Sequence, residues 1–103
     1  MSFKLRFVQK FEQANTDVFM ELEKEFARLE REIPEFPKGR RWVPYLGGGM
    51  MNTLIWEADF PTLQRAIDAK LFFERDTRHE ELFAKQVKLF IESTVEIYRS
   101  VCD

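Results

Sequence analysis

Hydrophobic and polar residues alternate at the start of the chain, over residues 3–12. The residues that face one way are Phe3, Leu5, Phe7 and Phe11, and those that face the other way are Lys4, Arg6, Val8, Lys10 and Glu12. A period of two residues is typical of a β-strand with one buried face. We therefore predict a strand over residues 3–12.

The period then changes to about 3.6 residues, which predicts an amphipathic helix. Its apolar stripe is made of Phe19, Leu22, Phe26, Leu29 and Ile33, and charged residues, among them Glu23 and Glu30, are assigned to the solvent side. Asn15 or Thr16 is the expected N-cap, because a short polar side chain can accept a hydrogen bond from a free amide of the first turn. Pro34 and Pro37 end the helix.

Two β-prone runs, Arg41–Leu46 and Asn52–Phe60, flank three consecutive glycines. Because glycine tolerates positive φ, the connection Gly47–Met51 is predicted to be a hairpin-type turn or a bulged bend. Pro44 has no amide hydrogen, so the first of the two strands is expected at a sheet edge or a bulge. In the second strand one face carries Leu54, Trp56, Ala58 and Phe60, and the other carries Thr53, Ile55, Glu57 and Asp59.

The last third of the chain reads as two helices and a strand. Pro61 suits the first turn of a helix. Thr77-Arg78-His79-Glu80 fits a capping box, which predicts a second helix from Thr77 with Leu82, Phe83, Val87 and Phe90 as its apolar positions. Ser93–Val101 alternates again and predicts a final strand, although a helix that continues to Arg99 is an alternative.

The predicted order of elements is β-α-β-β-α-(α)-β within a single domain of residues 1–103. This order predicts an α+β, ferredoxin-like βαββαβ fold, in which an antiparallel four-stranded sheet carries its helices on one face. The other face would retain the apolar side chains Val8, Ile55 and Tyr98. Soluble proteins rarely leave a large apolar patch exposed, so we expect these residues to lie in a homodimer interface between two sheets.

The segment MNTLIWEADFPTLQRAIDA carries a resemblance to a known superfamily. Together with the strand order and the short length, it resembles the dimeric α+β barrel proteins, which include antibiotic-biosynthesis-monooxygenase-like and NIPSNAP-type domains. The sharpest part is Asn52–Leu63, a strand ending in W-E-x-x-F-P-x-L that leads into a helix. The resemblance implies a homodimer whose sheets meet in a barrel. It implies no single chemistry, because some members are cofactor-independent oxygenases, some bind haem and many have no assigned activity.

Composition limits the function further. The chain has 103 residues with a formal net charge of −2 and no basic block, so nucleic acid is not an expected partner. Its single cysteine, Cys102, cannot form an internal disulfide, and no spacing of metal ligands is present, so neither a metal nor a cofactor is predicted. We find neither a signal peptide nor a membrane-length apolar segment, and we expect no membrane partner and a cytoplasmic location.

The candidate ligand pocket lies between sheet and helices, lined by Trp42, Tyr45 and Trp56. With Arg40 and Arg41 these aromatics could bind an aromatic or acidic ligand, or they could be ordinary core and edge residues. His79 would need to face a pocket to act as a base, but the first turn of a helix is usually exposed. The catalytic residues therefore stay unknown, and whether the protein is an enzyme stays open.

A second candidate surface lies on the outside of the helices. Leu63, Ala66 and Ile67 define the apolar stripe of the helix after Pro61, which places Lys70 inside the stripe and Phe72 opposite it. The residues Met20, Leu71, Phe72 and Phe73 could then contact further copies of the chain. Two functions follow: a homodimeric small-molecule-binding or cofactor-independent oxygenase-like protein, or a non-catalytic subunit, natural or engineered, of a larger symmetric assembly.

Overall fold

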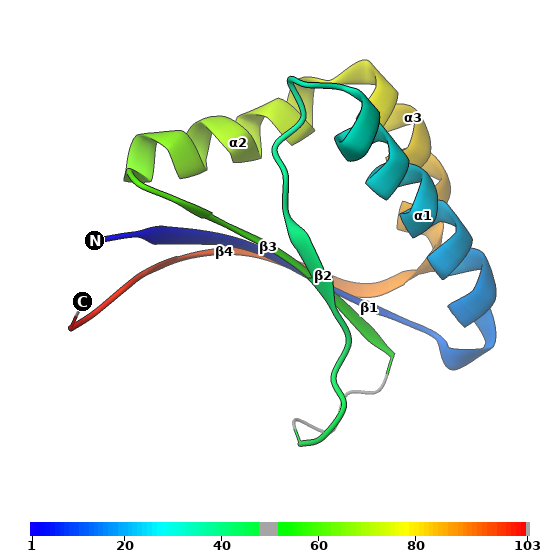
Figure 1. Cartoon of the computed structure of the whole chain (residues 1–103). Coiled ribbons are helices and arrows are strands. Elements are labelled where there is room, and N and C mark those ends of the chain that lie inside the picture. The colour runs from blue at the N-terminus through cyan, green and yellow to red at the C-terminus, as the bar shows by residue number, and fades with distance from the viewer. Residues whose placement is uncertain (48–51, 103) are drawn as a thin grey trace.

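The computed structural model describes residues 1–47 and 52–102, and over these ranges it contains four strands and three α-helices (Figure 1). The elements are β1 (Phe3–Phe11), α1 (Thr16–Glu32), β2 (Arg40–Trp42), β3 (Thr53–Phe60), α2 (Leu63–Arg75), α3 (Thr77–Gln86) and β4 (Phe90–Arg99). The final strand is thus confirmed over its helical alternative. The predicted glycine turn falls mostly outside the described residues.

The strands form one antiparallel sheet in the order β2-β3-β1-β4, and all three helices lie on the same side of it (Figure 1). The predicted ferredoxin-like α+β architecture is therefore confirmed. β2 is an edge strand and ends at Trp42, earlier than the predicted Leu46. Pro44 explains both results, because a residue without an N–H cannot continue a ladder of hydrogen bonds.

The register assigns each side chain to a face. Phe7 lies opposite Trp56 on one side and Val95 on the other, so these three residues face the helices. Arg41 is also paired with Trp56, which places it on the inner face of β2. Two groups of buried apolar residues fill this side of the sheet: Leu5, Phe36, Trp56, Ala58, Ala69 and Phe73 in one, and Phe11, Phe19 and Leu54 in the other.

The helix starts agree with the sequence prediction in part: Asn15 is the N-cap of α1 and α3 begins at Thr77, as predicted, but the start of α2 and the capping hydrogen bonds differ. The Asn15 side chain makes no capping bond, and Thr16 Oγ1 instead donates to the Gln13 carbonyl at 2.7 Å. Thr62, rather than Pro61, precedes α2, and its hydroxyl accepts from the Arg65 amide at 3.1 Å. Asp76, rather than Thr77, caps α3. A carboxylate is a better cap than a hydroxyl at this position because it also carries negative charge to the positive end of the helix.

Of the proposed assembly surface on the helices, Phe73 is buried within one chain, and Met20, Leu71 and Phe72 are partly buried. The inner stripe of α2 is Ala66, Ala69 and Phe73, which is rotated from the predicted stripe and places Phe73 in the core at 7% exposure. Phe72 packs edge-on against Phe36 at 5.0 Å between ring centroids, so it needs no partner chain. Met20 packs partly buried against the second apolar group. Lys70 lies at the helix flank and pairs with Glu74.

The outer face of the sheet carries charges that pair within one chain. Lys4 and Arg6 both contact Glu57, at 3.5 and 3.0 Å, and Arg6 also lies over the ring of Tyr98. Next to the Arg6 and Glu57 pair lie Val8 and Ile55, which are directly opposite each other across β1 and β3. Val8 and Ile55, two of the three predicted interface residues, are therefore neighbours and partly exposed. The third, Tyr98, is 45% exposed.

None of the helices that the described ranges contain is both long and apolar enough to cross a bilayer.

Candidate functional site

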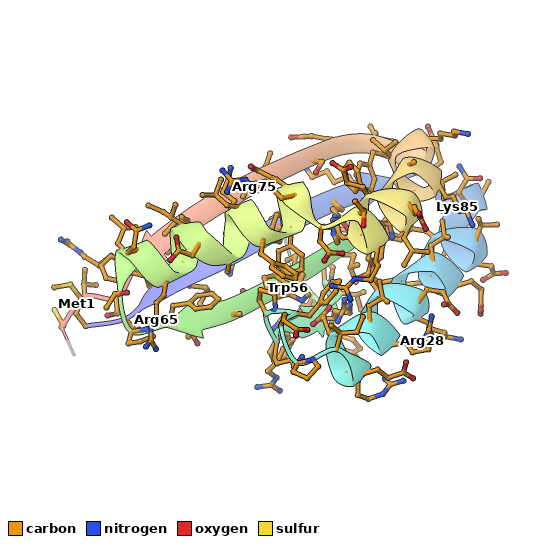
Figure 2. All side chains as sticks on the ribbon, turned by 90° about the horizontal axis from the view of Figure 1, so that it is seen from above. Met1, Arg28, Trp56, Arg65, Arg75 and Lys85 are labelled. Atoms are coloured by element: carbon orange, nitrogen blue, oxygen red, sulfur yellow. The ribbon has the colours of Figure 1, made fainter. Side chains whose placement is uncertain are left out.

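A cavity of about 360 Å³ lies between the inner face of the sheet and the three helices. All four strands and all three α-helices of the described ranges contribute side chains to its walls. The lining side chains are Phe7, Gln9, Glu23, Phe26, Glu30, Phe36, Arg41, Trp56, Phe73, Glu74, His79, Glu80, Phe83, Gln86, Ser93 and Val95. Figure 2 looks down on the helices and shows Trp56, from β3, near the middle of the molecule between α2 and α1. A mostly apolar cavity with a few converging polar groups is the usual form of a small-molecule site.

Two carboxylates of α1 are buried in the wall of this cavity. Glu23 is 7% exposed and Glu30 is 6% exposed, although the sequence pattern assigned both to the solvent side. Arg41 of β2 explains their position. Its Nε donates to Glu23 at 2.5 Å, and its Nη2 donates to Glu30. One guanidinium therefore bridges two carboxylates, and the group carries one uncompensated negative charge when both carboxylates are ionised.

Neutral donors satisfy the remaining oxygens of the two carboxylates. Gln86, which is 1% exposed, donates from Nε2 to Glu23 at 2.9 Å. The indole N–H of Trp56 donates to Glu30 at 3.2 Å, and the Gly39 amide donates to the same oxygen at 3.3 Å. Buried charges are tolerated where hydrogen bonds satisfy them in this way. The network also holds the Trp56 ring in a fixed orientation at the cavity.

His79 faces the cavity rather than solvent, which corrects the expectation of an exposed residue. Its ring centroid lies 4.9 Å from that of Phe26, 5.1 Å from Phe73 and 5.9 Å from Phe83. Burial among these rings lowers the pKa of His79 below its ordinary value of 6.5, although the charges of Asp76 and Glu30 act in the opposite direction. The imidazole is therefore neutral at pH 7 and can accept a proton or a hydrogen bond.

His79 reaches this position because the N-cap of α3 is Asp76, one residue before the predicted cap Thr77. Asp76 Oδ1 accepts from the His79 amide at 3.1 Å, so the cap fixes the backbone of the residue that carries the imidazole. The pKa of Asp76 is lowered, mainly by its hydrogen bond from Arg78, so the cap remains ionised. The sequence motif located the start of α3 at Thr77, but it assigned the cap to Thr77 instead of Asp76 and placed His79 on the solvent side.

Of the three aromatic residues that the sequence suggested for the pocket, the structure places one there. Trp56 lines the cavity at 5% exposure. Trp42 pairs with Ile55 on the outer face of the sheet, where Arg40 lies over its ring at 4.6 Å. Tyr45 follows the end of β2 and is 99% exposed. The alternation along β2 separates Trp42 from Arg41, which is why only the arginine reaches the cavity.

Two signals in the sequence could have located the polar part of the site. At 100° per residue, Glu23 and Glu30 lie about 40° and 20° from Phe19 on the wheel of α1, at the edge of its apolar stripe. Gln9 interrupts the apolar series on the inner face of β1. It lies opposite Ser93 of β4, and both line the cavity. Polar residues on the buried face of an element indicate either a bonded network or a site.

No three side chains among His, Cys, Asp and Glu converge as possible metal ligands in the described ranges. The side chains of Glu23, Glu30, Arg41, Gln86 and Trp56 are instead bonded to one another. The arrangement can accept hydrogen bonds at Glu23 and His79, and it offers aromatic faces on several sides. It is suited to enclosing an organic molecule.

Comparison with known proteins gives a result at the level of fold. No family model and no curated protein matches the sequence. Among solved structures, the chain is similar to a NIPSNAP family protein from Agrobacterium tumefaciens (12% identity, 99% of this chain and 95% of that chain, TM-score 0.78). It is also similar to a NIPSNAP-like domain protein from Burkholderia xenovorans (12%, 98% and 86%, TM-score 0.76). An antibiotic biosynthesis monooxygenase has a TM-score of 0.70 (13%, 96% and 98%). The resemblance inferred from Asn52–Leu63 is therefore confirmed as a likeness of fold: this chain has the α+β fold of NIPSNAP-family and antibiotic-biosynthesis-monooxygenase proteins.

Proposed function

We propose that this protein binds a small organic molecule in the cavity between sheet and helices. The observation that carries the proposal is the cavity itself, a space of about 360 Å³ whose walls are largely aromatic and whose polar groups are already oriented by hydrogen bonds. Sites of this size and lining enclose most of the surface of a ligand with one or two rings. An alternative role as a larger assembly subunit loses its main support, because Phe72 packs against Phe36 within the chain and Phe73 is buried in the core.

The proposal is tested by filling the cavity from its β4 side. Ser93 lines the cavity, so Ser93→Phe is expected to occupy part of the space and to weaken binding of naphthalene-sized aromatic probes. Ala84→Phe adds the same side chain at an exposed position of α3 that does not line the cavity, and it should leave binding unchanged. Binding is measured by titration calorimetry. If the probes bind with equal affinity to Ser93→Phe, Ala84→Phe and the parent protein, the ligand binds outside the cavity.

We also propose that two copies associate through the outer faces of their sheets. Support comes from the apolar side chains left on that face, where Trp42 is 44% and Tyr98 is 45% exposed and Val8 lies beside Ile55. Burial of apolar surface yields about 25 cal/mol per Å², part of which offsets the entropy lost on association. Light scattering of the parent protein should give twice the mass of one chain, and the Ile55→Asp variant should give the mass of one chain. A monomeric parent protein at micromolar concentration would contradict the proposal.

An oxygenase-like activity is the second candidate, and His79 is the observation that favours it. A neutral imidazole in an apolar cavity is a suitable base for removing a proton from a bound phenol or enol, which then becomes more reactive toward oxygen. Oxygen uptake in the presence of such compounds, lost in His79→Gln, would support the activity. If no uptake is seen with compounds that do bind, the binding role alone remains.

A further inference from the structure

We propose that the cavity selects an organic monocation, an amine or quaternary ammonium attached to an aromatic body. This inference rests on the proposed binding function and specifies the chemical class of its ligand. The sequence alone allowed an aromatic or acidic ligand. Three features of the cavity decide between these: its charge, the free acceptor capacity of Glu23 and the arrangement of its rings.

The charge of the cavity wall is negative. Its lining contains four carboxylates, those of Glu23, Glu30, Glu74 and Glu80, against the single guanidinium of Arg41. Glu74 is offset by its pair with Lys70 on the outside of α2. The remaining excess lies with the two buried carboxylates and Glu80. An anionic ligand would add another negative charge to a poorly solvated site, whereas a cation would neutralise one.

Arg41 does not reverse this balance. Its guanidinium forms ion pairs with Glu23 and Glu30, so its positive charge already lies between two negative ones. An incoming carboxylate would have to compete with both of them for the guanidinium. Release of either carboxylate would leave a buried charge without its partner, which is strongly unfavourable.

Glu23 has the capacity to receive a ligand donor. Its Oε1 accepts one hydrogen bond from Gln86, and its Oε2 accepts one from Arg41. A carboxylate has about four acceptor positions, so roughly half of those on Glu23 are free of these bonds. Glu30 is more fully used, because its Oε1 already accepts from Trp56 and Gly39. An ammonium group in the cavity would therefore be expected to bind beside Glu23.

The aromatic rings provide the second half of the recognition. Phe7, Trp56 and Phe73 form a compact trio, with centroid separations of 5.4, 5.5 and 5.1 Å, and all three line the cavity. Phe26 and Phe83 add rings from α1 and α3. Aromatic faces attract a cation and also pack against an aromatic ligand body, so both parts of the proposed ligand have suitable surroundings.

Three probes that share one ring system test the inference: 1-naphthylmethylamine, 1-naphthalenemethanol and 1-naphthoate, titrated by calorimetry near neutral pH. The ammonium probe is expected to bind about tenfold more tightly than the neutral alcohol, with the carboxylate weakest. Equal or tighter binding of the alcohol or carboxylate overturns the charge selection but preserves small-molecule binding. Failure of all three at millimolar concentration overturns both this inference and the proposed function.

The Glu23→Gln variant tests whether Glu23 is the source of the preference for the ammonium probe. The substitution keeps an oxygen that can accept from Gln86 or Arg41 but removes one negative charge, and the preference for the ammonium probe over the alcohol should fall about tenfold. Glu21→Gln is the matched control on the same helix, because the Glu21 side chain is 72% exposed and does not line the cavity. An unchanged preference in folded Glu23→Gln overturns the assignment. If this variant does not fold, the probe series on the parent protein still decides the inference.

Discussion

Replacement of Arg41 by methionine is the most direct test of the buried network. The change keeps a long side chain but removes the guanidinium that bridges Glu23 and Glu30. The side chains of these two carboxylates are 9% and 8% exposed, so water cannot readily replace the lost partner. Removal of one partner from a buried ion pair typically costs about 3–5 kcal/mol. A domain of this size has a total stability of about 5–15 kcal/mol, so the loss should be easy to measure.

The assay is urea unfolding followed by tryptophan fluorescence, because Trp56 is part of the same network. We expect the free energy of unfolding of Arg41→Met to fall by about 3–5 kcal/mol at neutral pH. The double variant with Glu23→Gln should recover part of this loss, because removal of one of the two neighbouring negative charges relieves the repulsion between them.

Arg40→Met is the matched control. Arg40 is the preceding residue of β2 but lies on the outer face, where its contact is the ring of the 44% exposed Trp42. Loss of such a contact costs about 0.5–1 kcal/mol. If Arg41→Met were no more destabilising than Arg40→Met, or if Glu23→Gln recovered none of its loss, the buried carboxylates would not require Arg41 and the reasoning would be wrong.

Three further predictions concern single residues around the site. Because burial lowers the pKa of His79, the unfolded chain binds a proton at this residue at higher pH than the folded chain does, and stability should decline as pH falls below about 6.5. His79→Gln should flatten this part of the plot of urea midpoint against pH. An unchanged slope would argue against burial as the cause. Asp76→Ala should lose about 1 kcal/mol in urea unfolding, and Thr77→Ala only a few tenths; the reverse order would restore Thr77 as the cap. A methyl group at Gly39 would overlap the indole of Trp56, so Gly39→Ala should destabilise by about 1–3 kcal/mol, and a neutral thermal melt would contradict the close packing.

Much of the fold could be predicted because periodicity reports directly on which face of an element is buried. The alternation over residues 3–12 and 52–60 located β1 and β3, and the 3.6-residue stripe located α1. The details that were wrong depend on contacts between elements. The inner stripe of α2 is set by its packing against β1 and β3, and two short alanines, Ala66 and Ala69, allow that close approach. Hydropathy alone favoured Leu63, which is 46% exposed.

The site was less predictable, and the reason is specific. A glutamate on an amphipathic helix is normally assigned to solvent, and its burial becomes reasonable only once a cation is known to face it. That cation, Arg41, is 18 residues from Glu23 in sequence. Its orientation depends on the register between β2 and β3, which pairs it with Trp56. The sequence contained both halves of the network but no information about which strand face Arg41 would occupy.

The buried network is also the strongest argument that the cavity serves a function. Well-packed apolar residues in place of a buried ion group are often neutral or stabilising, so the fold does not need Glu23, Glu30 and Arg41 in order to be stable. Proteins tend to break the rules of core composition where a site requires it. Here the departure from those rules coincides with an aromatic cavity and with a neutral His79 in its wall. If the network served stability alone, the triple replacement of its charged members by apolar residues would leave ligand binding intact. We expect the triple variant to fold and to lose its preference for cationic probes.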